Sequence, residues 1–327
     1  MILATDGVIQ GAGALAALWN GAFGSWYAFL SATLVRATPL LLLGLAVALA
    51  FRAGVLNIGA EGQFLAGAVG ATLVALHSAG LPGFVVFAAM LAAGAVGGAL
   101  WSGVAAILRW RFGVLEVIST LLLNFVASSL VSWLVRGPLQ EPTGVYPQTR
   151  PFAPEAHWPF LVAGYRLHVG FAVGVTAALG LWWIVSHSAA GLRLRATGAG
   201  ASAAASAGLI DVERTVFGVF LASGALAGAA GASEVGGVTF ALYDGLSPGY
   251  GYTAIAVALL ARLDARWVIL SAVLFGALQA GSAEMQRTAG IPSAVVNVVV
   301  ALIVLALLGV QTVRRSRTGS HVVDGAP

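Results

Sequence analysis

Apolar residues along this chain fall into long blocks separated by short polar stretches, with none of the alternation expected of surface strands. About 20 apolar residues in a helix cross the roughly 30 Å hydrocarbon layer of a bilayer. The pattern therefore predicts an all-α, polytopic transmembrane helical bundle with about nine (eight to ten) membrane segments. They are residues 37–51, 62–77, 84–108, 114–135, 169–187, 215–235, 252–261, 267–283 and 292–310.

Composition supports a membrane protein. Only 9% of the residues are charged and 59% are hydrophobic, whereas a soluble domain carries about 25% charged residues. Lipid must cover most of such a surface. We expect residues 1–327 to form one transmembrane domain with a lipid bilayer as its surroundings.

Arginine is distributed unevenly between the two sides of the predicted bundle. Eleven arginines fall on one side and five on the other, which places the richer side in the cytoplasm. Residues 187–214 and the tail 311–327 are then cytoplasmic, and residues 136–168 form an external loop. Residues 1–36 form an external or interfacial segment without a recognisable signal peptide. The eleven are Arg52, Arg109, Arg111, Arg193, Arg195, Arg214, Arg262, Arg266, Arg314, Arg315 and Arg317; the five are Arg36, Arg136, Arg150, Arg166 and Arg287.

Polar residues inside apolar segments are the candidates for a solute path. Asn57 and Glu61 lie where glycines divide the run FRAGVLNIGAEGQFLAGAVGA into two short apolar pieces. Broken helices with polar residues at the break often build transporter binding sites. The alternative interpretation is a polar turn between two ordinary helices.

A second candidate group follows one face of the fourth segment. Glu116, Thr120 and Asn124 recur every four residues, so they share a helical face. Such a face must meet protein or water rather than lipid, and hydrogen bonding between helices explains it as well as solute contact does. Gln279 and Asn297 are further candidates near the last two segments.

The predicted cytoplasmic loop 187–214 is rich in small residues. Between its charged ends it reads TGAGASAAASAGLI, which can form a short helix that another protein approaches closely. The alternative is a flexible linker. The candidate docking residues are Arg195, Gly198, Ala203, Ala204 and Gly208.

The sequence lacks the residues that several classes of chemistry require. The chain has no lysine for a phosphate-binding loop and no cysteine for thiolate sites. It also lacks a basic stripe with interleaved aromatics for nucleic acid and any convergent catalytic cluster. We therefore expect no enzyme activity, no nucleic-acid partner, and neither a metal nor another cofactor in this chain.

Four ordered motifs carry a family resemblance: FRAGVLNIGAEGQ, EVISTLLLNFVA, GYGYTAIAVALLAR and GIPSAVVNVVVALIVL. Over residues 14–310 the chain resembles the permeases of bacterial ATP-binding-cassette (ABC) importers of the branched-chain amino acid, ribose and nucleoside group. It looks most like the nucleoside and simple-sugar branch. In the coupling loop it departs from the family's usual Asn-Pro and Tyr, with Gly200, Ala201 and Ser206 in that region.

The resemblance implies a complex in the bacterial cytoplasmic (inner) membrane. Its other members would be a second, usually non-identical permease subunit, a cytoplasmic ABC ATPase that binds ATP and Mg, and an extracytoplasmic substrate-binding lipoprotein. The expected solute is a nucleoside, with sugars and branched-chain amino acids as alternatives, and residues 195–209 would be the coupling segment. Duplicated halves are frequent in transporters, and the likeness of residues 40–54 to 254–267 indicates an internal pseudo-repeat.

Two rival hypotheses belong to other classes. An ion-coupled secondary transporter would work without an ATPase and would depend on a carboxylate such as Glu61 or Glu116. A membrane enzyme would need a catalytic cluster, and the sequence offers none.

Overall fold

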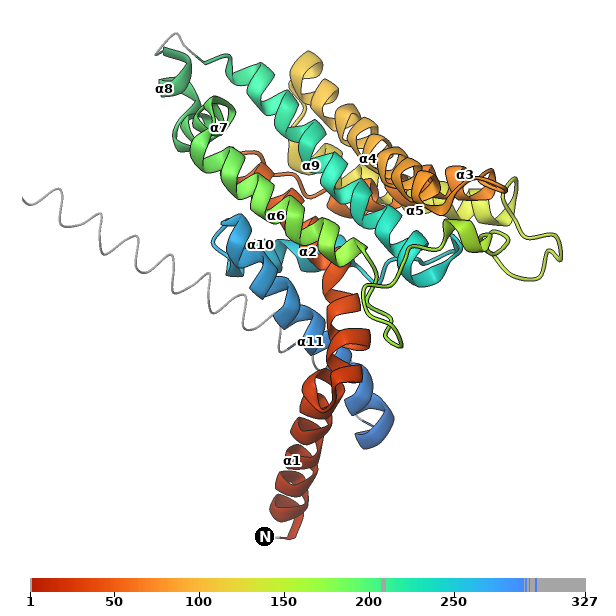
Figure 1. The fold of residues 1–327 in the computed structure, drawn as a ribbon. Coiled ribbons are helices and arrows are strands. Elements are labelled where there is room, and N and C mark those ends of the chain that lie inside the picture. Colours follow the sequence, from red (N-terminus) through yellow and green to blue (C-terminus); the bar gives the residue numbers. More distant parts are fainter. Residues whose placement is uncertain (1, 207–209, 291, 293, 295–297, 299–327) are drawn as a thin grey trace, which may run out of the picture.

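A computed structural model describes residues 2–206, 210–290, 292, 294 and 298, and this part of the chain is helical apart from loops and two isolated β-bridges. The candidate docking residue Gly208, the candidate path residue Asn297 and the predicted tail 311–327 lie outside the described residues. In chain order (Figure 1) the elements are α1 (Ile2–Phe23), η1 (Ala28–Thr33), α2 (Leu34–Arg52), α3 (Ala60–Leu76), α4 (Gly83–Phe112), α5 (Glu116–Arg136), η2 (Pro154–Ala156), α6 (Gly170–His187), α7 (Ala189–Ala199), α8 (Ala201–Ser206), α9 (Val212–Glu234), η3 (Val235–Thr239), α10 (Tyr250–Leu260) and α11 (Ala265–Ala289).

The prediction of an all-α transmembrane bundle is confirmed. Within the described residues, six helices are long and apolar enough to cross a membrane, and α3 and α10 are shorter apolar helices. Together they account for the first eight predicted segments. The ninth, 292–310, lies almost wholly outside the described residues, so a total of nine stays a prediction.

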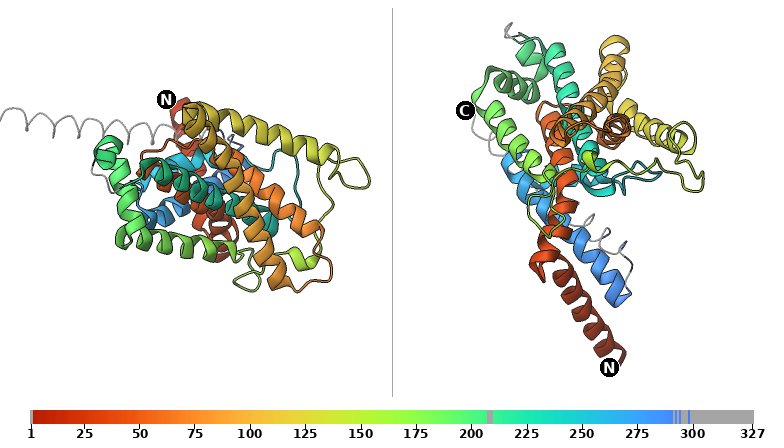
Figure 2. Two further views of the ribbon diagram at one scale, coloured as in Figure 1. Left: turned by 90° about the horizontal axis from the view of Figure 1, so that it is seen from above. Right: turned by 45° about the vertical axis from the view of Figure 1, so that its right-hand side comes forward.

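The first span, Ala28–Arg52, lies at the centre of the bundle (Figures 1 and 2). It joins the π-helical turn η1 to α2, and 89% of the residues in its most apolar stretch are buried inside the protein. It begins nine residues before the predicted segment 37–51, because Thr33 and Arg36 interrupt the apolar pattern there. Helix α1 extends beyond the bundle and packs mainly along α11.

Glycines bring α3, α4 and α9 into close contact. A Cβ atom on Gly228 of α9 would collide with the carbonyl oxygen of Gly94 on α4, and one on Gly98 would collide with that of Gly224. A Cβ on Gly67 of α3 would likewise collide with the Gly228 backbone. Small residues at helix crossings are characteristic of membrane bundles, where backbones approach closely.

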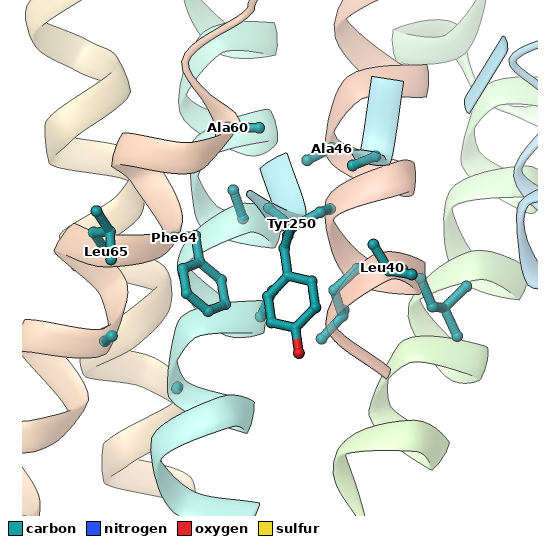
Figure 3. Packing of buried hydrophobic residues seen from close by; sticks show 14 of the residues in the cluster. Leu40, Ala46, Ala60, Phe64, Leu65 and Tyr250 are labelled. Carbon is teal, nitrogen blue, oxygen red and sulfur yellow. The ribbon is translucent and has the colours of Figure 1, made fainter. Parts of the chain in front are cut away.

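Helices α3 and α10 each begin after an irregular, partly buried segment. Residues 53–59 precede α3, and residues 240–249, with Leu242 and Leu246 almost fully buried, precede α10. Figure 3 shows Tyr250 at the start of α10 lying between Phe64 of α3 and Leu40 of α2. The Phe64 and Tyr250 rings meet edge to face, with centroids 6.0 Å apart.

The predicted loop 136–168 is an ordered connection between α5 and α6. It runs beside residues 236–244: Thr149 N–H donates to Leu242 O at 2.8 Å, and Trp158 N–H donates to Gly236 O at 2.8 Å. The loop therefore supports the irregular segment that leads into α10.

Candidate functional site

The break between α2 and α3 is held together by a buried amide pair. Asn57 Nδ2 donates to Gln63 Oε1 at 3.1 Å and to Ser223 Oγ at 3.0 Å. Its Oδ1 accepts from Gln63 Nε2 at 2.9 Å and from Gly59 N–H at 3.0 Å. Asn57 is fully buried, and protein groups use both ends of its amide, so its place in the structure is that of a positioning residue.

Glu61 lies where the first turns of α3 and α10 meet. Its Oε2 accepts a hydrogen bond from Gly251 N–H at 2.6 Å. A Cβ atom on Gly251 would overlap the Glu61 backbone, so this approach requires glycine. The Ser247 side chain also lies within hydrogen-bonding range of this carboxylate.

Of the three candidates predicted on α5, Thr120 and Asn124 attach that helix to the break. Asn124 Oδ1 accepts from Gly62 N–H at 2.8 Å, and its Nδ2 donates to Ile58 O at 3.0 Å. Thr120 Oγ1 accepts from Ile58 N–H at 3.3 Å. Glu116 instead forms an ion pair with Arg109 at 2.7 Å at the corner between α4 and α5. The face therefore makes contacts between helices, as one of the two interpretations of its spacing requires.

A cavity of about 170 Å³ opens between α3, α5 and the segment before α10. Its lining combines Glu61 and Asn124 with hydroxyl groups and apolar side chains. Small-molecule sites usually measure roughly 300–1,000 Å³, so this cavity has the size of part of a site. The lining residues are Glu61, Leu65, Asn124, Phe125, Ser128, Val131, Gly245, Leu246, Ser247 and Tyr252.

The structure thus brings together some predicted candidates and separates others. Glu61, Thr120 and Asn124 meet around the break, while Glu116 lies at the α4–α5 corner. Gln279 is half-buried on α11, which packs on α1 and α2, and is not among the cavity residues.

One buried carboxylate escaped the sequence analysis. Glu234, at the end of α9, is 5% exposed and lies within electrostatic range of Arg36 and Arg166. A carboxylate at the end of an otherwise apolar helix is a signal that could have identified it. The hydroxyl groups of Ser128 and Ser247 in the cavity gave no comparable signal, because serine is common in membrane helices.

The predicted coupling segment forms two short helices, α7 and α8. Arg195 donates to the Val185 carbonyl oxygen, and a Cβ on Gly198 would collide with the Arg52 carbonyl oxygen at the end of α2. Ala204 is buried at 6% exposure, whereas Ala203 is exposed. Of these two alanines, Ala203 is the one available to another protein.

Comparisons with known proteins find similar sequences over most of the chain. Residues 29–322 match the family described as "Branched-chain amino acid transport system / permease component". The chain is 38% identical over 300 residues to a glucose ABC transporter permease protein of Haloferax volcanii, covering 89% of this chain and 78% of the relative. It is 38% identical over 305 residues to a guanosine ABC transporter permease protein of Bacillus subtilis, covering 91% and 86%. A nucleoside ABC transporter permease protein of Lactococcus lactis is 29% identical over 287 residues, covering 83% and 77%.

Proposed function

The chain belongs to the family of permease components of branched-chain amino acid transport systems, and on this premise we propose that it forms the solute path of an ATP-driven nucleoside importer. The cavity at the α3–α10 junction is the observation that supports a nucleoside as the solute. It presents a carboxylate, an amide and hydroxyl groups beside apolar walls. These groups match the hydroxyls of a ribose and the polar edge of a base.

The names of the relatives support the same class of solute. A guanosine permease and a nucleoside permease are among them. A sugar is the second candidate, because a glucose permease is equally identical over a similar length and the same polar groups bind sugar hydroxyls.

Energy for transport would come from a partner. The chain has no lysine for a phosphate-binding loop, and no group of three His, Cys, Asp or Glu side chains within the described residues could hold a metal. We infer a complex with a cytoplasmic ATPase that binds ATP and Mg, a second permease subunit and an extracytoplasmic binding lipoprotein, in the bacterial cytoplasmic membrane. The second permease would complete the partial site.

The deciding experiment is uptake of radiolabelled guanosine and glucose into cells that carry this chain with its neighbouring transport genes. A paired strain carries an ATPase whose catalytic glutamate is disabled. Nucleoside uptake that disappears in the paired strain supports the proposal. Glucose uptake alone would transfer the function to sugars, and uptake that survives the ATPase lesion would overturn the mechanism in favour of a secondary transporter.

Glu61→Gln tests whether the cavity is on the path. The substituted amide oxygen can still accept from Gly251 N–H, so assembly should persist. A hydrogen bond to a charged group is worth about 1.5–3 kcal/mol, so uptake should fall about tenfold or more. Glu155→Gln, an exposed carboxylate in η2, is the matched control and should transport normally. Normal uptake by Glu61→Gln would remove Glu61 from the path.

A further inference from the structure

A second, larger hollow lies between α6, α7 and α9, next to Arg193 of α7 and Arg214 at the start of α9. Its volume is about 520 Å³, and α2 contributes Leu49 to its floor. It is separate from the cavity at the α3–α10 junction, with which it shares no lining residue. Figure 1 shows α7 crossing the ends of α6 and α9 at this place.

The walls of this groove are apolar and continuous with exposed apolar side chains of α6. Leu181, Ile184 and Val185 form one wall, and Ile184 is 44% exposed. On the opposite wall, a Cβ atom on Gly218 of α9 would meet nothing within 4 Å. The groove therefore has room for an apolar chain entering from the membrane.

The rim of the groove is basic. Arg193 of α7 and Arg214 of α9 line it, and both are exposed. Asp211, the acidic residue of the lining, pairs with Arg214 at 2.9 Å. The two arginines outnumber the one aspartate of the lining, so the rim keeps a net positive charge.

We propose that this groove binds one anionic phospholipid from the leaflet on the arginine-rich side of the membrane. The acyl chain lies between α6 and α9, and the phosphate lies against Arg193 and Arg214. Basic pockets between membrane helices on the cytoplasmic side bind anionic headgroups in this manner. An apolar groove with a cationic rim matches an anionic lipid, whereas the polar cavity at the α3–α10 junction matches a polar solute.

Bound there, the lipid joins α7 to the bundle, since its chain contacts α6 and α9 and its headgroup contacts α7. This gives the segment 189–199 a further attachment beside the contact of Gly198 with the end of α2 and the hydrogen bond from Arg195 to Val185 O. The inference does not depend on the solute or on the ATPase.

The test is photocrosslinking of the protein in nanodiscs, with diazirine-labelled phosphatidylglycerol compared with diazirine-labelled phosphatidylethanolamine. We expect crosslinked peptides from α6 and α9 with phosphatidylglycerol and several-fold fewer with phosphatidylethanolamine. Arg193→Gln combined with Arg214→Gln should lower the phosphatidylglycerol signal, by about fivefold for each arginine removed near an anionic surface. Gly218→Leu should fill the groove and remove the signal.

Gly180→Leu is the matched control, because Gly180 is an exposed glycine of α6 outside the groove whose Cβ also meets nothing within 4 Å. It should leave crosslinking unchanged. Equal labelling by both lipids, or labelling unaffected by the arginine variants, would show an ordinary annular lipid and overturn the proposal.

A second test asks whether the chain itself fills the groove. The chain has no native cysteine, so Ala222→Cys can be paired with single cysteines in residues 299–327. Efficient crosslinking of such a pair would make the chain's own segment the occupant and overturn the proposal as well.

Discussion

At the scale of single residues, the polar side chains around the break differ in their hydrogen-bond partners and in whether they line the cavity. Asn57 and Asn124 each donate a hydrogen bond through the side-chain nitrogen and accept one through the side-chain oxygen. Glu61 gives one oxygen to Gly251 and lies in the lining of the cavity. Glu61 and Asn124 line the cavity and can contact a solute, whereas Asn57, which is paired at both ends of its amide and does not line the cavity, holds the backbone.

Asn57→Ala should destabilise the protein. The substitution leaves the Gln63 amide without its Asn57 partner, while the Ser223 hydroxyl loses one bond and still donates to Ala46 O. An unsatisfied buried polar group costs about 1–3 kcal/mol. Thermal unfolding of the purified protein in detergent should occur several degrees lower. Asn20→Ala, at an exposed position of α1, should unfold at the wild-type temperature; an unchanged midpoint for Asn57→Ala would contradict the positioning role.

His168, in the connection before α6, should make stability depend on pH. Burial, followed by the charge of Arg166, lowers the pKa of His168 to about 4. An unfolded histidine has a pKa of about 6.5, so the unfolded state binds the proton first and stability falls as the pH drops from about 6.5 towards 4. The loss should approach about 3 kcal/mol near pH 4.

The measurement is the unfolding midpoint between pH 7 and pH 4.5. His168→Asn, whose side-chain oxygen can replace Nδ1 as the acceptor for Gly170 N–H, should show a flatter profile. His77→Asn, at an exposed helix end, should keep the wild-type profile. Equal slopes for all three proteins would assign the acid sensitivity to another group.

At the scale of elements, the bundle depends on backbone contact where α4 crosses α9. Gly94, Gly98, Gly224 and Gly228 leave no room for side chains at this crossing. Lipid tails are as apolar as leucine, so such packing replaces the hydrophobic effect as the force that holds membrane helices together. A methyl group at the crossing should therefore separate the two helices.

Gly228→Ala should destabilise the bundle by about 1–3 kcal/mol, the usual effect of overpacking. Gly218→Ala is a matched control on the same helix, since its Cβ meets nothing within 4 Å. Alanine favours helix over glycine by about 0.5–1 kcal/mol, so this control should unfold at the same or a higher temperature. If both variants unfold alike in detergent, close packing at Gly228 does not determine stability.

Helices and site residues differ in how far the sequence predicts them. Long apolar blocks predict helices, because a chain that crosses the bilayer core must hydrogen-bond its own backbone groups, and a helix does so within one segment. Polarity within those blocks identified Asn57, Thr120 and Asn124, but their meeting with residues 58–63 depends on how α5 packs against the break. The grouping of Gln279 with these candidates rested on polarity alone, and the packing of α11 places it elsewhere.

At the scale of the whole molecule, α2 connects the predicted coupling segment with the break between α2 and α3. Its last residue, Arg52, is in close backbone contact with Gly198 of α7, and its guanidinium donates to Leu263 O at 3.3 Å beyond the end of α10. The break that carries Glu61 follows within nine residues of Arg52. A displacement of α7 would therefore act on the ends of α2 and α10. The segments next to these two helices line the cavity.

If an ATPase docks on α8, Ala203→Arg should uncouple hydrolysis from uptake, because a long charged side chain at this exposed position obstructs close approach. The expected result is weaker co-purification of the ATPase and loss of solute-stimulated hydrolysis, with the unfolding temperature of the permease unchanged. Ala204→Arg should instead lower that temperature, because Ala204 is buried. Ala163→Arg, an exposed alanine in the loop between α5 and α6, carries the same charge change and should transport normally. An Ala203→Arg complex that assembles and couples like the wild type would show that the ATPase docks elsewhere, and the contact between Gly198 and Arg52 would then be structural.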